Sequence, residues 1–87
     1  MYYVSMTDTF LSGWGKAEGK KAKFINECYS YEEALIVADN ARNRSDQTNI
    51  KIHKERPVFD ESLYYVEYKT KEDMPNWYKP GFFANKE

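Results

Sequence analysis

Residues 30–45, SYEEALIVADNARNRS, decide the fold because they carry the clearest helical pattern in the chain. Ser30 and Glu33 have the spacing of a capping box, in which each side chain accepts a hydrogen bond from the other residue's amide. An apolar stripe at helical spacing follows, made of Tyr31, Ala34, Leu35, Val37, Ala38 and Ala41. The pattern predicts a helix that ends near Ser45 and has Leu35 on its buried face.

Four segments on either side of this helix have the alternating, aromatic or β-branched character of strands. They are residues 2–7, 22–29, 50–53 and 63–69. Polar clusters predict turns at residues 46–49 and 60–62, and residues 71–78 can form a short helical turn limited by Pro75. The order β-β-α-β-β predicts a single α+β domain over residues 1–87. Its sheet is mostly antiparallel, the long helix packs on one face, and an aromatic tail follows.

Composition narrows the classes of protein that this chain can represent. The net charge is −1, and proteins that bind nucleic acid in general are usually basic. Cys28 is the only cysteine, so no disulfide framework exists and a reducing compartment is favoured. The first residues lack the pattern of a secretion signal, and no apolar run is long enough to cross a membrane. We therefore expect a cytoplasmic protein without membrane contact.

Catalytic chemistry finds little support in the residue types present. The chain has one histidine, His53, and one cysteine, Cys28, so a metal cluster or a nucleophile triad cannot be assembled from them. His53 is predicted to be solvated on the polar side of its strand, and Cys28 to be a small buried residue. Adjacent carboxylates occur at turns or at the helix start, where they cap and solubilise. The sequence thus predicts a non-enzymatic protein with no catalytic residues, metal or cofactor.

The loop of residues 12–21, SGWGKAEGKK, is the first candidate binding segment. Its glycines permit close backbone approach and its lysines supply charge, but the spacing and the absent Ser or Thr do not match a P-loop. The candidate contact residues are Trp14, Lys16, Lys20 and Lys21. The glycines are expected to leave the free loop flexible, so that it orders on a partner. The alternative is a hairpin loop in which Trp14 folds back on the sheet.

The C-terminal tail and the helix supply further candidates. Trp77 and Tyr78, with Phe82 and Phe83, form an aromatic set that could anchor a partner. The alternative is a tail that packs over the open sheet face and completes a small core. Ile36 lies opposite the alanine stripe among polar residues. It is either an isolated exposed residue or a partner contact.

Nucleic-acid binding is the second functional class that the residues allow. Tyr64, Val66 and Tyr68 share one face of their strand and could stack bases, although the aromatic motif of RNA-recognition sheets is absent. The alternative for these residues is cross-strand packing. Lys23 would extend the lysines of the neighbouring loop into a basic stripe.

A resemblance rests on residues 10–19 (FLSGWGKAEG), 31–34 (YEEA) and 41–46 (ARNRSD), together with Trp77 and Tyr78. These segments resemble small uncharacterised proteins carried by bacteriophages and integrative mobile elements of Gram-positive bacteria. The resemblance implies a mobile-element setting in a bacterial host cell. Small phage proteins of this kind often bind and disable a host factor, including CRISPR and other defence enzymes.

Two functional hypotheses therefore remain. The first is a binding protein of a phage or mobile element that contacts and inhibits a host protein. The second is a small nucleic-acid-binding accessory protein that uses the lysines and aromatic rings. Lysines and rings on one common face would favour nucleic acid, whereas an exposed face that mixes carboxylates with rings would favour a protein partner.

Overall fold

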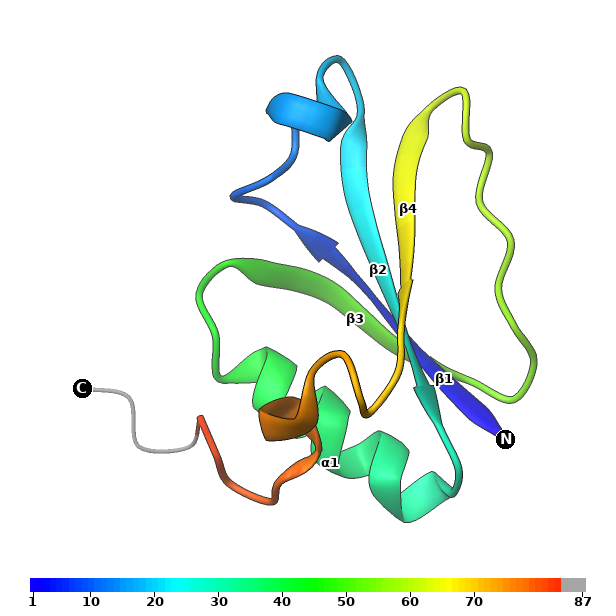
Figure 1. The fold of residues 1–87 in the computed structure, drawn as a ribbon, viewed down its shortest axis with the longest axis vertical. Coiled ribbons are helices and arrows are strands. Elements are labelled where there is room, and N and C mark those ends of the chain that lie inside the picture. The colour runs from blue at the N-terminus through cyan, green and yellow to red at the C-terminus, as the bar shows by residue number, and fades with distance from the viewer. Residues whose placement is uncertain (84–87) are drawn as a thin grey trace.

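The computed structural model describes residues 1–83, with the side chain of Lys16 excepted. The strands are β1 (Tyr2–Asp8), β2 (Lys21–Cys28), β3 (Gln47–His53) and β4 (Tyr64–Lys69). They form one sheet in the order β3-β1-β2-β4, and the helix α1 (Tyr31–Arg42) lies across one face of it (Figure 1). Two short 3-10 helices, η1 (Gly15–Ala17) and η2 (Pro75–Tyr78), complete the described elements. The α+β class and the β-β-α-β-β order are confirmed.

The sheet is mixed. β1 pairs antiparallel with β2 and with β3, whereas β4 runs parallel to β2. β3 and β4 occupy opposite edges of the sheet, so residues 54–63 must connect one edge to the other. These residues also travel the length of the sheet, because β3 ends beside Tyr3 and β4 begins beside Lys21, at the other end of the β1–β2 pair. An extended segment of this length spans about 33 Å, which is sufficient.

β3 begins earlier than the sequence predicted. Residues 47–49 were expected in a turn, yet they belong to the strand. The pairing of β1 with β3 shifts register between Ser5 and Thr7, and Asn49 adopts a φ of 56° there. Asparagine tolerates this left-handed conformation better than most residues. The polar, turn-like sequence is thus explained by an irregularity inside the strand.

The start of α1 follows the predicted cap with one change of partner. The Ser30 hydroxyl accepts a hydrogen bond from the Glu33 amide at 3.1 Å. The Glu33 carboxylate accepts from the amide of Tyr29 at 2.8 Å, and not from that of Ser30. The same carboxylate pairs with Lys71 at 2.6 Å, which ties the helix start to the segment after β4. The helix ends at Arg42, three residues before the predicted end.

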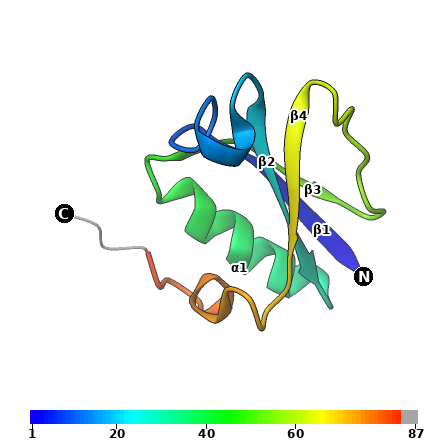
Figure 2. The ribbon, with the colours of Figure 1, turned by 45° about the horizontal axis from the view of Figure 1, so that its top comes forward.

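The buried face of α1 consists of small residues that let the helix lie close to the sheet. Ala34, Val37, Ala38 and Ala41 are all fully buried, as expected. Leu35 is 43% exposed, so the prediction that it anchors the helix was wrong. Asn40, which the sequence placed on the polar side, is fully buried instead. The reason is that η2 packs against α1 and covers the flank that carries Asn40 (Figure 2).

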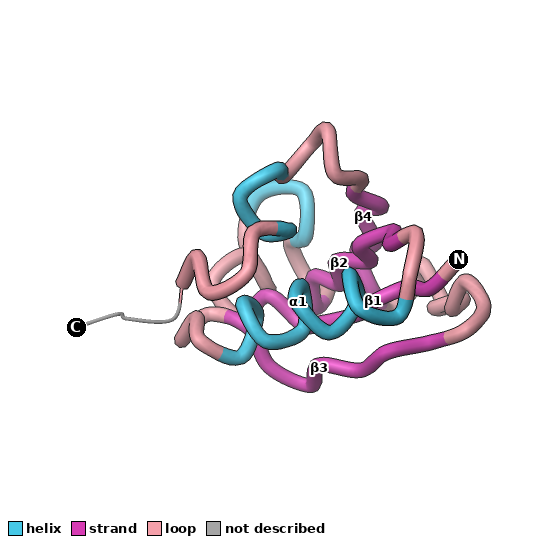
Figure 3. Tube along the Cα trace, turned by 90° about the horizontal axis from the view of Figure 1, so that it is seen from below, coloured by secondary structure: helices cyan, strands magenta, loops and turns pink. Residues whose placement is uncertain are grey.

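The core lies between α1 and the sheet and is completed by the C-terminal segment. Viewed from below, the strands run from β3 to β4 behind α1 (Figure 3). Val4, Met6 and Cys28 from the sheet meet the helix alanines, and Trp77 and Tyr78 from η2 join the same cluster. The tail therefore packs on the same side of the sheet as α1. The alternative considered from the sequence, in which the tail covers the opposite face, was wrong in this respect.

The face of the sheet away from α1 is partly covered by the connection of residues 54–63. The Phe59 ring contacts the Tyr64 ring edge-on at 5.7 Å between centroids. The Arg56 guanidinium lies 4.3 Å from the centroid of the Tyr68 ring. These contacts agree with the alternative that the strand tyrosines take part in packing, because each of the two rings has a neighbour from the connection.

Candidate binding site

The loop of residues 9–20, between β1 and β2, is held by its own hydrogen bonds. The Asp8 carboxylate accepts from the amides of Phe10 and Leu11 at 2.9 and 3.0 Å. The Ser12 hydroxyl donates to the Asp8 carbonyl at 2.7 Å and accepts from the Ala22 amide at 2.9 Å. The sequence predicted a flexible loop, whereas the structure contains a loop whose backbone is hydrogen-bonded by the side chains of Asp8 and Ser12.

Glycine is required in this loop by backbone conformation rather than by space. The φ angles of Gly13 and Gly19 are +83° and +76°, values that residues with a Cβ rarely adopt. A Cβ built on either glycine would meet no atom within 4 Å. The Gly13 amide donates to the Lys20 carbonyl at 2.9 Å, so the loop closes on itself at its base.

Two large rings project from this closed loop. Trp14 is 70% exposed and Phe10 is 79% exposed. The sequence alternative, in which Trp14 folds back on the sheet, is therefore not what the structure contains. Phe10 was not named as a site residue from the sequence, although it lies in residues 10–19, the segment that carries the resemblance. Lys16 belongs to η1, but its side chain lies outside the described part of the structure.

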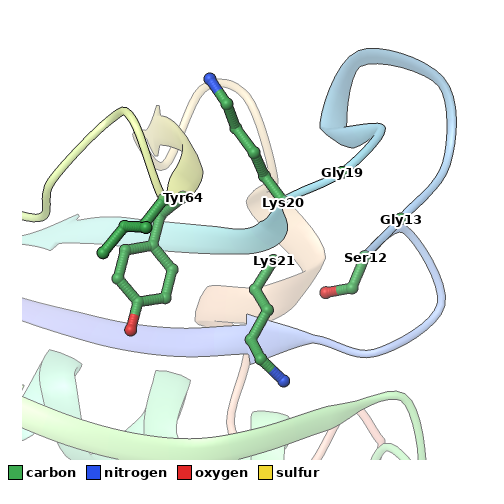
Figure 4. Close-up of a pocket in the computed structure, with 7 residues that line it drawn as sticks. Ser12, Gly13, Gly19, Lys20, Lys21 and Tyr64 are labelled. Atoms are coloured by element: carbon green, nitrogen blue, oxygen red, sulfur yellow. The ribbon is translucent and has the colours of Figure 1, made fainter.

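A pocket of about 550 Å³ lies between this loop and the start of β4. Its lining residues are Ser12, Gly13, Gly19, Lys20, Lys21, Leu63 and Tyr64. Lys21 and Tyr64 are direct neighbours in the parallel β2–β4 pairing, and their side chains extend to the same side in Figure 4. The Lys20 side chain points the other way, and its amine donates to the Glu61 carbonyl at 2.8 Å. The two predicted lysines therefore have different surroundings.

Lys23 lies close to Tyr64, one of the residues that line this pocket. Only 5% of the residue is exposed, and its amine donates to the Thr7 hydroxyl at 2.7 Å. The amine also lies 5.1 and 5.4 Å from the centroids of the Phe59 and Tyr64 rings. Burial lowers the pKa of Lys23 below its ordinary value, and the like charges of Lys51 and Lys21 lower it further. No ion pair of Lys23 occurs within residues 1–83.

The structure places Trp77 and Tyr78 in the core, which corrects their prediction as binding residues. Trp77 is 9% exposed and Tyr78 is 7% exposed. The Tyr78 hydroxyl donates to the Glu27 carbonyl at 2.8 Å, and burial raises the pKa of this phenol. The Trp77 ring meets the edge of Phe83 at 5.4 Å between centroids. A chain this small needs the apolar area of both rings to complete its interior.

The helix surface also differs from the prediction. Ile36, expected opposite the buried stripe, is half-buried. Leu35 and Tyr31, expected to be buried, are 43% and 51% exposed. They share their outer surface of α1 with exposed carboxylates such as Glu32. This part of the surface mixes rings with acidic groups, whereas Lys21 and Lys23 accompany Tyr64 on the sheet. Both arrangements of charge considered from the sequence therefore occur, on separate regions.

The single histidine and the single cysteine have structural surroundings. His53 is half-buried, which differs from the expected solvated position, and its Nε2 lies 2.7 Å from the Ser5 hydroxyl. Burial and the nearby charge of Lys51 lower the pKa of His53. Ser5 is only 3% exposed in the middle of β1. Burial, with the charge of Glu33, raises the pKa of the Cys28 thiol to about 12.

Comparisons with protein-family models, with curated proteins and with solved structures found no match. Among residues 1–83, no helix has the length and apolar character needed to cross a membrane. The same residues contain no group of three or more potential metal-ligating side chains.

Proposed function

We propose that this chain is a non-enzymatic binding protein that docks on a partner protein through the loop of residues 9–20. The observation that carries the proposal is Trp14, which is 70% exposed at the outside of a loop that is already ordered. Tryptophan is the residue type most enriched at the energetic centres of protein interfaces. Phe10, 79% exposed on the same loop, supplies a second apolar ring.

The order of the loop also favours docking. Three contacts fix the backbone before a partner arrives. The Asp8 carboxylate accepts from the Phe10 amide, the Ser12 hydroxyl donates to the Asp8 carbonyl, and the Gly13 amide donates to the Lys20 carbonyl. A preformed loop loses less conformational entropy on binding than a flexible one, so more of the contact energy appears as affinity. This replaces the idea of a loop that orders only on its partner.

The proposal includes a setting and an effect. We infer that the chain is a phage or mobile-element protein that acts in the cytoplasm of a bacterial host. It would contact and inhibit a host protein there, with a CRISPR or other defence complex as the most concrete target. Support comes from the resemblance of residues 10–19, which include both exposed rings of the loop.

The docking proposal is tested by capture from a bacterial host lysate with and without nuclease treatment. Trp14→Ala should weaken retention of the partner by about 2 kcal/mol or more, the range of interface hot spots. Tyr29→Ala is the matched control, because Tyr29 is 67% exposed but lies outside the loop. Equal partner recovery by wild-type protein and Trp14→Ala would contradict docking through this loop.

The inhibitory effect needs a separate assay. In cells that carry a defence system, expression of the wild-type protein should restore plating of a phage that the system targets. Trp14→Ala should restore it poorly at the same expression level. Restoration that is absent for both proteins would reject inhibition of that system and leave the docking measurement to stand by itself.

Nucleic-acid binding is the second candidate, and one observation favours it. Lys21, Lys23 and Lys51 act on one another electrostatically on the sheet face that carries Tyr64. Against a continuous basic stripe, Lys23 is buried and Lys20 is bonded to the Glu61 carbonyl. If nucleic acid is the main partner, binding by the wild-type protein should fall steeply with salt, and the double change Lys20→Ala and Lys21→Ala should abolish it.

A further inference from the structure

The pocket beside the loop has features that protein docking through Trp14 does not use. It combines a half-buried ring, Tyr64, an apolar side chain, Leu63, and an exposed lysine, Lys21. We propose that this pocket binds a phosphorylated nucleoside, with the phosphate at Lys21 and the base against Tyr64 and Leu63. The proposal does not use Trp14, although residues of the docking loop line the pocket, and it gives a ligand chemistry to the second candidate function.

The charge around the pocket favours an anion at Lys21. Lys23 is only 5% exposed. Its amine contacts the Thr7 hydroxyl and the rings of Phe59 and Tyr64. It forms no ion pair within the described part of the chain. A buried charge without a counter-charge is costly, and the positive field of Lys51 adds to it. A phosphate bound at Lys21 would supply a negative charge near Lys23 and so reduce the free-energy cost of burying the Lys23 amine.

Acidic residues lie close to Lys20, which is one of the pocket residues. Asp60 and Glu61 belong to the turn before β4, and the Lys20 amine is bonded to the carbonyl of Glu61. The charge of Lys20 also helps to lower the pKa of Asp60, after hydrogen bonds from Ser62. Lys20 is thus partly neutralised, and the phosphate position is assigned to Lys21, whose side chain extends away from that turn (Figure 4).

The apolar part of the pocket suits a planar base. The edge-on contact with Phe59, at 5.7 Å, and the Lys23 amine hold the Tyr64 ring in place. Leu63 is 61% exposed beside it. A volume of about 550 Å³ lies within the usual range for small-ligand pockets, about 300–1,000 Å³. Stacking of a base on a fixed aromatic ring is independent of sequence, so it does not select one base.

On the loop side, part of the pocket wall is glycine backbone. Gly13 and Gly19 bring bare backbone to the wall, with open space where a Cβ would be. Ser12 also lines the wall, but its proton is donated to the Asp8 carbonyl. It therefore holds the loop in position and is not assigned a bond to phosphate.

A phosphorylated nucleoside could reach the pocket as a free nucleotide or as one nucleotide of a single-stranded nucleic acid. Titration calorimetry with AMP, adenosine, inorganic phosphate and the single-stranded oligonucleotide d(A)12 distinguishes them. AMP should bind saturably and more tightly than adenosine or phosphate alone. Similar affinity for AMP and d(A)12 would identify a free nucleotide, whereas much tighter binding of d(A)12 would identify a strand.

Three variants test the assigned contacts. Lys21→Ala should weaken AMP binding about tenfold, because a charge-assisted contact to phosphate is lost. Leu63→Glu should weaken it by a similar factor through repulsion, and both positions are exposed, so folding is retained. Lys54→Ala removes the same charge from an exposed lysine outside the pocket and should leave AMP affinity unchanged.

Several results would overturn the proposal. They are the absence of saturable AMP binding at millimolar concentration, equal affinity for AMP and phosphate, and equal losses in Lys21→Ala and Lys54→Ala. The docking proposal stands or falls separately, since Trp14 does not line the pocket. Trp14→Ala should bind AMP like the wild-type protein, even though it loses the partner protein.

Discussion

The two tryptophans occupy opposite kinds of environment, although both were predicted to be binding residues. Trp14 projects from the loop between β1 and β2 and is 70% exposed, whereas Trp77 lies in η2 against α1 and is 9% exposed. Each stands in a polar, turn-rich segment with other aromatic residues nearby. The residue type and its neighbours in sequence are similar, so they do not separate an anchor of the core from an exposed ring.

The difference follows from what each segment can contact. Near Trp14 the loop closes on itself through Ser12 and the Gly13–Lys20 hydrogen bond, and its bond to a distant segment, from the Thr9 amide to the Asp46 carbonyl, lies at its start. The Trp77 segment has internal backbone bonds, from Trp77 to Met74 and from Lys79 to Asn76, and it is also held by Asn40 of α1. The Asn40 amide donates to the Trp77 and Lys79 carbonyls at 2.8 and 2.9 Å. A ring is buried where the rest of the molecule binds its backbone.

The largest effect is expected from removing the buried ring. Trp77→Ala should destabilise the fold by about 3–5 kcal/mol, because it leaves a cavity between α1 and the tail. The midpoint of thermal unfolding should fall by about 4–8 °C for each kcal/mol in a domain of this size. Trp77→Phe, which keeps part of the packing, should fall between wild type and Ala. An unchanged unfolding midpoint in Trp77→Ala would mean that the Trp77 ring, like that of Trp14, contributes little to stability, and the contrast between the two tryptophans would be lost.

A second change tests the bonds that hold the tail. Asn40→Ala should cost about 3 kcal/mol, because the carbonyls of Trp77 and Lys79 and the amide of Phe83 lose a buried partner. Urea unfolding followed by circular dichroism measures the loss. Asn43→Ala is the matched control, since Asn43 caps the end of the same helix and its side chain donates to the Asp39 carbonyl at an exposed position. Similar losses in both variants would show that Asn40 does not hold the tail specifically.

Alkaline pH should affect the Trp77 region and spare the loop. The pKa of Cys28, in the same core cluster as Trp77, is raised from 9.0 to about 12, so the folded state favours the neutral thiol. This contribution to stability is complete below about pH 9 and is lost as the pH rises from there toward about 12. Urea unfolding at neutral pH and at about pH 10 should show the loss, and Cys28→Ala should show less of it. Equal pH dependence in the two proteins would exclude the thiol as its source.

The smallest effect on stability is expected at the exposed ring. Trp14→Ala should change the free energy of unfolding by no more than about 0.5 kcal/mol, as for other surface positions. Acrylamide should quench the fluorescence of Trp14 in Trp77→Phe much more strongly than that of Trp77 in Trp14→Phe. A marked fall in thermal stability of Trp14→Ala would mean that the ring packs on the protein in solution.

Local features of the fold were predictable because they depend on near neighbours in the chain. The cap at Ser30 and the alternation of residues 2–7 and 63–69 each gave the correct element. Prediction was less accurate where a distant segment intervenes. The sequence pattern indicates that Asn40 is a surface residue, but η2 covers it in the structure. The same pattern indicates that Leu35 is buried, but α1 packs on the sheet through its alanines and leaves Leu35 exposed.

The candidate site was predictable only in part, for the same reason. Trp14, Lys20 and Lys21 could be selected from the sequence because a glycine-rich loop with lysines and a large ring is a visible pattern. The pocket was not visible, since it needs Tyr64, from a strand that reaches Lys21 only after the chain has crossed the molecule, and Leu63, from the turn before that strand.

The sequence by itself determined the elements, their order, and the segments rich in rings and charges. Hydrogen bonding and side-chain preference within a few residues decide these features. The tertiary structure alone decided that β4 lies parallel to β2, that Trp77 is buried while Trp14 is exposed, and that Lys23 is enclosed beside the pocket. These features depend on the path of residues 54–63 across the sheet and on the docking of the C-terminal segment. The burial of a side chain is a property of the segments that meet around it.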